Sequence, residues 1–236
     1  MKLDLYRCPV VVVGAWNRAI FSPEWVQKRL FSEGERLQAE IGFLPPLLQY
    51  STDLVALSID GPQLRVVPLK ASNDAFEEAE RVALAVLEKL GETPLAGMGV
   101  NFGFDVSAPT EMLRQLLEHA DRAALQHLGA ELISSSLTRT FSLEGRTLNL
   151  IITKNDGPWR LDFNHHTALS TAEEARERMR RLGDCKIEVC AGRLFVDEFQ
   201  RRMVLGMLLE NVGLDAAIEL AGPGLWRQAL SAKLLR

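Results

Sequence analysis

The residues with the clearest capacity for chemistry lie in one short segment, which reads Asp-Phe-Asn-His-His over positions 162–166. A carboxylate together with an imidazole can bind a divalent metal or act as a general base. Alternate residues of a β-strand share a face, so Asp162, Asn164 and His166 would point the same way. These three are the candidate catalytic residues, and Asp162 and His166 are the candidate metal ligands.

The same pattern is also expected on the solvent-facing side of an ordinary antiparallel strand. In that interpretation Asp162, Asn164 and His166 are only polar surface residues. His165 has the opposite parity and continues the apolar row of Phe163, so we expect it at the boundary of the core. Both interpretations stay open at the level of sequence.

Other catalytic signatures do not occur in the chain. There is no G-x-S-x-G, H-E-x-x-H, Walker or C-x-x-C motif. Gly97, Gly99 and Gly103 do not form G-x-G-x-x-G, and a strand crossed closely by another element explains them as well. The sequence therefore leans away from an enzyme, and we expect no cofactor, with a divalent metal as the alternative.

Arginine-rich helices offer a third kind of chemistry, phosphate binding. The arginines alternate with Glu173, Glu174 and Glu177, which favours ion-paired helix faces over a basic patch. The chain also carries 27 basic and 31 acidic residues, a formal net charge of −4. The charge balance therefore argues against nucleic acid as the partner and leaves nucleic-acid binding as an alternative. The arginines concerned are Arg176, Arg178, Arg180, Arg181, Arg201 and Arg202.

The candidate residues must be positioned by a sheet. Residues 132–143, 147–153 and 159–166 alternate apolar and polar side chains and are separated by Glu144-Gly145 and by the turn at 155–158. They predict a three-strand antiparallel meander. Residues 54–59 and 64–69 flank Asp60-Gly61-Pro62 and predict a hairpin, and residues 95–106 predict a further strand.

Helical periodicity predicts amphipathic helices between these strands. Ser22 and Pro23 begin a short helix, and apolar spacings of three and four over residues 76–90 predict a longer one. Asp74 with Glu77, and Ser170 with Glu173, have the spacing of capping boxes. The fold class is α+β: a largely antiparallel sheet of hairpins and a three-strand meander, with several packed amphipathic helices.

We expect a compact body over residues 1–213 and a C-terminal helical appendage over residues 214–236. The body divides into two pseudo-repeated halves, about 1–106 and 107–213. Gly222-Pro223-Gly224 forms a hinge before a terminal amphipathic helix. That helix is the predicted site for a protein partner or for homo-oligomerisation, through Leu225, Trp226, Leu230 and Leu234.

Two stretches carry a resemblance. They are the segment Gly97-Met98-Gly99-Val100-Asn101-Phe102 after a helix, and the strand Gly145 to Leu150 leading to Leu161-Asp162-Phe163-Asn164-His165-His166. In these the chain resembles a group of uncharacterised, sporadically distributed bacterial proteins of unknown function. The resemblance implies a bacterial cytoplasmic protein of accessory character and supplies no catalytic residue.

The charged N-terminus lacks the apolar region of a signal peptide, and the odd number of cysteines, three, favours a reducing compartment. We therefore expect a soluble cytoplasmic protein that does not contact a membrane. The leading function is a non-catalytic binding or assembly subunit of a bacterial multi-protein system. The alternatives are a metal-dependent hydrolase or nuclease using Asp162 and His166, and a nucleic-acid-binding accessory protein using the arginine-rich helices.

Overall fold

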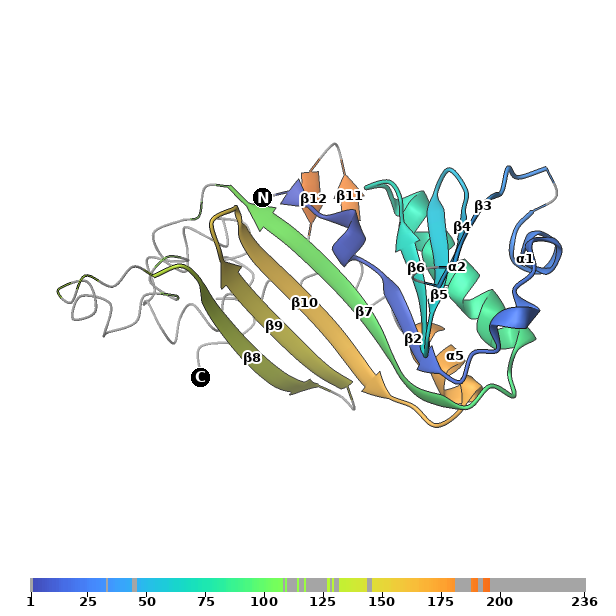
Figure 1. The fold of residues 1–236 in the computed structure, drawn as a ribbon. Helices are drawn as coiled ribbons and strands as arrows, with labels where there is room; N and C mark the ends of the chain where they lie inside the picture. Colours follow the sequence, from blue (N-terminus) through green and yellow to red (C-terminus); the bar gives the residue numbers. More distant parts are fainter. Residues whose placement is uncertain are drawn as a thin grey trace.

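A ten-stranded antiparallel sheet dominates the structure (Figure 1). The computed structural model describes residues 2–32, 34–43, 46–107, 109, 114, 117, 127, 129, 132–143, 146–180, 188–190 and 193–195. Within these ranges the sheet is accompanied by three α-helices and a separate two-stranded ribbon. The predicted α+β class and the antiparallel sheet are confirmed.

The strands of the sheet run in the order β3-β4-β5-β6-β2-β7-β10-β9-β8, and β1 pairs with the far end of β7. Every strand pair among the described residues is antiparallel. The strands are β1 (Lys2–Leu3), β2 (Val10–Gly14), β3 (Gln38–Phe43), β4 (Pro46–Ser51), β5 (Val55–Asp60), β6 (Gln63–Pro68), β7 (Leu95–Val106), β8 (Ser135–Leu143), β9 (Arg146–Lys154) and β10 (Trp159–Ala168). The separate ribbon pairs β11 (Glu188–Cys190) with β12 (Arg193–Phe195).

The valine run near the N-terminus forms β2, which lies between β6 and β7 in the middle of the sheet. Val10 and Val12 are buried, whereas Val11 and Val13 are half-buried on the other face. Branched side chains suit such a pleated surface with neighbours on both sides. The first strands of the chain thus link its later hairpins into one sheet.

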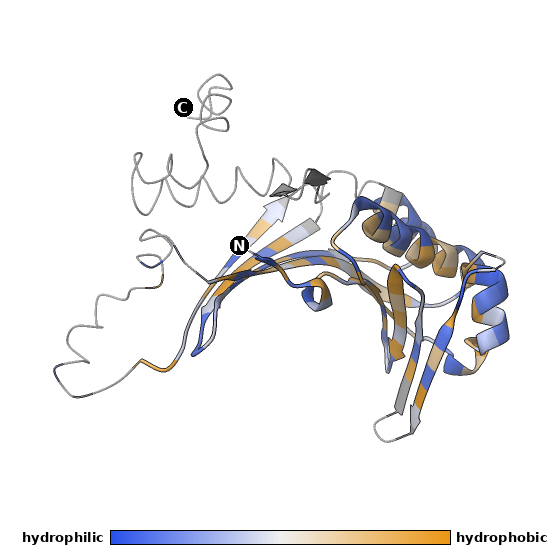
Figure 2. Ribbon diagram, turned by 90° about the horizontal axis from the view of Figure 1, so that it is seen from above, coloured by the Kyte–Doolittle hydropathy of each residue, from blue (hydrophilic) through white to orange (hydrophobic). Residues whose placement is uncertain are grey.

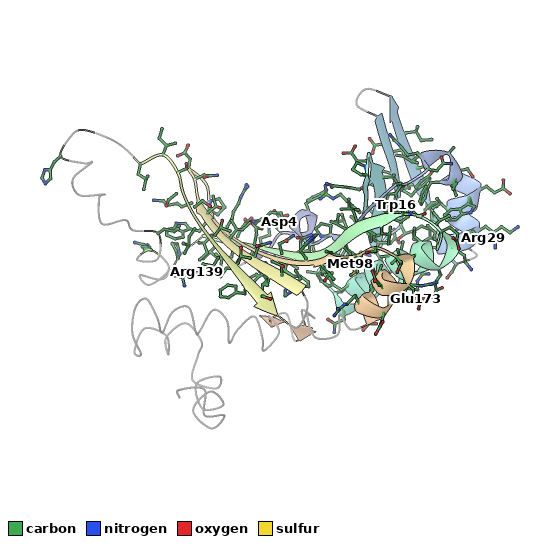
Figure 3. The ribbon with its side chains drawn as sticks, turned by 90° about the horizontal axis from the view of Figure 1, so that it is seen from below. Asp4, Trp16, Arg29, Met98, Arg139 and Glu173 are labelled. Atoms are coloured by element: carbon green, nitrogen blue, oxygen red, sulfur yellow. The ribbon has the colours of Figure 1, made fainter. Side chains whose placement is uncertain are left out.

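The helices are α1 (Pro23–Leu30), α2 (Asn73–Lys89) and α5 (Ala172–Arg180). The sheet is strongly bent, and α2 and α5 lie on its convex side, against the part formed by β5, β6, β2 and β7 (Figures 2 and 3). The face of α2 that carries Ala79, Val82 and Val86 is fully buried against the sheet and α5. The same side of the sheet receives Phe102, Phe104 and Phe163, so the convex side holds the main core.

Two helix starts differ from the predicted ones. Ser72, not Asp74, caps α2: its hydroxyl accepts a bond from the amide of Ala75 at 3.4 Å. At α5 the capping box is Thr171 with Glu174, one residue later than predicted, because Thr171 Oγ1 accepts from the amide of Glu174 at 3.2 Å. The predicted cap of α1 at Ser22 is confirmed.

Strands β8, β9 and β10 pair in sequence order. The first of them begins at Ser135, three residues after the predicted start, and Leu132 and Ile133 are exposed. Strands from both sides of residue 106 belong to the one sheet, since β7 pairs with β10 along its length. The predicted appendage over residues 214–236 lies outside the described residues. None of the described helices has the length and hydropathy that crossing a bilayer requires.

A short 3-10 helix, η1 (Leu5–Arg7), lies on the concave side of the sheet between β1 and β2. Here the chain leaves the ladder and folds back over β7, where Asp4 N donates to the carbonyl of Gly103 at 2.9 Å. A Cβ on Gly103 would lie 2.4 Å from Cβ of Arg7 and 2.9 Å from Oδ1 of Asp162. Gly103 is therefore required by the close approach of η1 to the strand.

Substituting Gly103→Ala should lower the free energy of unfolding by about 2 kcal/mol, because the added methyl group overlaps backbone-proximal atoms that cannot move independently. Urea unfolding followed by circular dichroism measures this loss. Gly157→Ala is the matched control, since a Cβ there meets no atom within 4 Å. Equal costs for the two substitutions would contradict the proposed packing of η1.

Candidate functional site

Strand β10 divides its side chains between the two faces of the sheet. Phe163 and His165 are buried on the convex side, and the His165 ring packs edge-on against Phe102 with centroids 6.1 Å apart. Asp162, Asn164 and His166 line a pocket on the concave side. Adjacent residues His165 and His166 thus occupy different environments, and the second is exposed.

The structure does not bring Asp162 and His166 together. They lie four residues apart on one strand, which corresponds to about 13 Å at the usual rise per residue. Their side chains project side by side and do not converge on one ion. Among the described residues, no group of three or more His, Cys, Asp or Glu side chains could hold a metal ion.

Asp162 instead belongs to an ion-pair cluster centred on Arg7, which we name the Arg7 cluster. The three guanidinium nitrogens of Arg7 each bond a different carboxylate: Nε to Asp4 at 2.8 Å, Nη1 to Asp162 at 2.7 Å and Nη2 to Asp105 at 2.6 Å. The Arg7 side chain is only 19% exposed. The cluster joins η1 to β7 and β10. Its bond from Arg7 already uses Oδ1 of Asp162, one of the two carboxylate oxygens of that residue.

Burial controls the ionisation of this region. Loss of solvent raises the pKa of Asp162 above its ordinary value, and the attraction of the Arg7 guanidinium opposes this rise only in part. Burial also raises the pKa of the neighbouring Cys8 thiol to about 12, and Cys8 Sγ donates to the carbonyl of Asp4 at 3.2 Å. Cys8 is therefore a protonated packing residue and not a nucleophile at neutral pH.

Beside the Arg7 cluster, four polar side chains form a hydrogen-bonded line across β8, β9, β10 and β7, which we name the amide row. Thr140 donates to Asn149 at 2.8 Å, Asn149 donates to Asn164 at 3.3 Å, and Asn164 donates to Asn101. Asn101 Nδ2 in turn donates to the carbonyl of Pro9 at 3.2 Å. All three asparagines are half-buried.

The direction of the amide row follows from its last acceptor. The carbonyl of Pro9 can only accept a hydrogen bond, so it requires the nitrogen of Asn101 and leaves the Asn101 oxygen facing Asn164. Asn164 must then present its nitrogen to Asn101 and its oxygen to Asn149. A single backbone carbonyl thereby sets the orientation of three side-chain amides.

Both groups border one pocket of about 600 Å³, which we name the concave pocket. Its volume lies within the range of small-molecule sites. The concave-facing positions of β7 explain the hollow, because Gly97 and Gly99 lie there without side chains between the taller rows of β10 and β2. The pocket is lined by Tyr6, Arg7, Pro9, Val11, Val13, Gln63, Arg65, Met98, Gly99, Asn101, Thr138, Asn149, Ile151, Asp162, Phe163, Asn164 and His166.

Charge is unevenly distributed around the concave pocket. The carboxylates of the Arg7 cluster are bonded to Arg7, and Arg160 also lowers the pKa of Asp162. On β6, two strands from β7, Arg65 is half-buried and has no ion pair among the described residues. The β6 end of the pocket therefore carries the cation that is open to a ligand.

Several residues of the concave pocket are absent from the sequence-based candidates. Asn149 could have been predicted from the sequence, because a turn at residues 155–158 implies a strand register that places Asn149 opposite Asn164. Arg7, Asn101 and Arg65 carried no such local signal. Of the arginines proposed for phosphate binding, Arg176 pairs with Glu173 on α5, while Arg181, Arg201 and Arg202 lie outside the described residues. The predicted partner-binding residues Leu225, Trp226, Leu230 and Leu234 lie outside them too.

The chain was also compared with known proteins. No protein-family model matches it, and no curated protein matches it either. The function must accordingly be argued from the concave pocket itself.

Arg7→Gln should lower the free energy of unfolding by roughly 2 kcal/mol, because three carboxylates would lose their common partner in a half-buried position. Arg81→Gln serves as the control, since Arg81 is 45% exposed and pairs with the single carboxylate of Glu78, besides donating one hydrogen bond to the carbonyl of Leu30. We expect the control to cost less than about 1 kcal/mol. Equal losses in chemical denaturation would show that the Arg7 cluster contributes no more than a surface ion pair.

Asp162→Asn should change the pH dependence of stability. Because the folded pKa of Asp162 is raised, its proton is bound more tightly in the folded state, and this contribution is lost as pH rises above the ordinary value of 3.8. An asparagine does not titrate, so the variant does not lose this stability. The difference in free energy of unfolding, variant minus native chain, should therefore increase from pH 3.5 to pH 7. Parallel profiles, or the opposite slope, would contradict the dominance of burial at Asp162.

Proposed function

We propose that the protein is a non-catalytic binding or assembly subunit of a bacterial cytoplasmic multi-protein system, and that the concave pocket is its recognition surface. The observation that carries this proposal is the amide row. Its side chains are fixed by one another and by the Pro9 carbonyl, and its three asparagines line the pocket. Such preorganised polar groups reduce the entropy lost on binding.

The geometry favours recognition over catalysis. The carboxylate that lines the pocket, Asp162, is bonded to Arg7, and His166 lies about 13 Å along the strand from it. A general base and its partner need hydrogen-bond contact with a common reacting group, and this pair has none. The spacing equally disfavours the metal-dependent hydrolase or nuclease that the Asp162 and His166 pattern suggested.

The proposed role in assembly is also supported by the amino-acid sequence that follows the described residues. The apolar spacing of Leu225, Trp226, Leu230 and Leu234 beyond a Gly-Pro-Gly hinge is typical of a docking helix. We propose that this helix binds a second copy of the chain or another subunit, while the concave pocket recognises a ligand or segment. Resemblance to accessory bacterial proteins in the Gly97–Phe102 and Gly145–His166 stretches agrees with such a role.

Deleting residues 222–236 from the full chain should abolish its self-association or its association with the partner subunit. Light scattering after gel filtration gives the mass, and affinity purification from cells that express the chain naturally gives partner recovery. Trp226→Ala with Leu230→Ala should reproduce the effect, and Gln228→Ala, outside the apolar spacing, should not. Unchanged mass together with full recovery of the partner after deletion would refute the assembly role.

A further inference from the structure

The hydrogen-bonding capacity left over in the amide row indicates what the concave pocket can bind. A side-chain amide has two N–H donors and two lone pairs on its oxygen. Within the described residues, Asn101, Asn149 and Asn164 each use one donor and one lone pair in the row itself. Each asparagine therefore retains one donor and one acceptor, which is the complement of a peptide group.

The spacing of the row also suits a polypeptide. Asn149 and Asn101 lie two strands apart, which corresponds to about 9.6 Å. A peptide in the polyproline II conformation presents the same side every three residues, or about 9.3 Å, and leaves its backbone groups without internal hydrogen bonds. The two outer asparagines can thus meet peptide groups three residues apart on one extended segment.

The length and walls of the concave pocket agree with this occupant. From Thr138 on β8 to Arg65 on β6 the lining crosses five strand spacings, about 24 Å, which matches roughly seven extended residues. Val11, Val13 and Ile151 add aliphatic surface between the polar groups. Gly99 keeps the floor open, so a backbone can approach the sheet closely.

Arg65 specifies the charge of the ligand. It is half-buried at one end of the concave pocket and has no ion pair among the described residues. A guanidinium in such a position binds a carboxylate through two parallel hydrogen bonds. Nucleic acid fits less well, because phosphates only accept hydrogen bonds and would leave the spare oxygen lone pairs of the row unmatched.

We propose that the concave pocket binds an extended acidic peptide segment, whose backbone meets the amide row and whose carboxylate pairs with Arg65. The inference rests on the proposed binding function and specifies the chemistry of the segment. The segment belongs to a protein partner, and it lies across the strands of the sheet rather than adding to an edge.

Fluorescence polarisation with the full chain tests this inference. The probe is a library of eight-residue peptides, acetylated and amidated so that the ends carry no charge, of which half carry one Glu and half the matched Gln. We expect the tightest binders to carry Glu, and Arg65→Gln to weaken these by about tenfold while leaving their Gln counterparts unchanged. Arg29→Gln, on the exposed face of α1, is the charge-matched control and should change neither.

Further variants test the row and the floor. Asn164→Ala removes the middle of the amide row and should weaken the Glu and Gln peptides equally. Gly99→Ala raises the floor of the concave pocket and should weaken the Glu and Gln peptides alike without loss of stability, because a Cβ there makes ordinary contacts at 3.4 Å or more. Gly99→Val, with two further methyl groups, should weaken both more. Thermal unfolding of each variant confirms that the chain is folded.

The inference is overturned if no peptide binds, if binding is indifferent to Arg65→Gln, Asn164→Ala and Gly99→Val, or if a neutral oligosaccharide or single-stranded DNA binds in place of the peptides. Its failure is distinguishable from failure of the proposed function. A chain that keeps its partner through residues 222–236 but binds no peptide refutes the peptide segment alone, whereas loss of both refutes the binding function as well.

Discussion

The arrangement of the concave side of the sheet depends on how the half-buried cation of Arg7 is neutralised. Arg7 is 19% exposed, and each of its three guanidinium nitrogens bonds a different carboxylate, from the N-cap of η1, from β7 and from β10. A cation this far removed from water is stable only when it is paired and hydrogen-bonded. The need to place Arg7 there draws η1 onto β7, and only a glycine at position 103 leaves room for it.

The amide row fixes further side chains across the concave side of the sheet, and its members are uncharged. The backbone carbonyl of Pro9, immediately before β2, orients Asn101, and the orientation passes through Asn164 to Asn149. Side chains from four strands therefore share one arrangement that none could hold alone. Because these polar groups bond one another, the concave side stays polar at little cost. The convex side of β7 packs instead against apolar residues of α2 and α5.

Local patterns in the sequence predicted much of this fold. The alternation along 159–166 predicted that His165 and His166 face opposite sides of the sheet, and they do. Ser22 was also predicted to cap α1, and it does. The capping residues Ser72 and Thr171 were misplaced by one or two positions, because neighbouring Ser, Thr and Asp residues can all cap and the surrounding packing selects one. The Arg7 to Asp162 pair spans 155 residues, and no local period encodes such a contact.

The glycines of β7 in the sequence indicate an unusual strand, but they do not predict a pocket. The pocket depends on which strands pair with β7. Glycines in a strand weaken it and indicate close approach of another element, which holds for Gly103. Gly97 and Gly99 face the same side, and the taller neighbours on β10 and β2 become walls only because β2 pairs with β7. Strand β2 pairs with β7, which lies nearly ninety residues later in the chain, so a pocket forms where the sequence shows only a strand rich in glycine. Three asparagine side chains on β7, β9 and β10 line this pocket beside Arg65, Asp162 and His166, so a pocket on one face of the sheet combines groups from segments far apart in the chain.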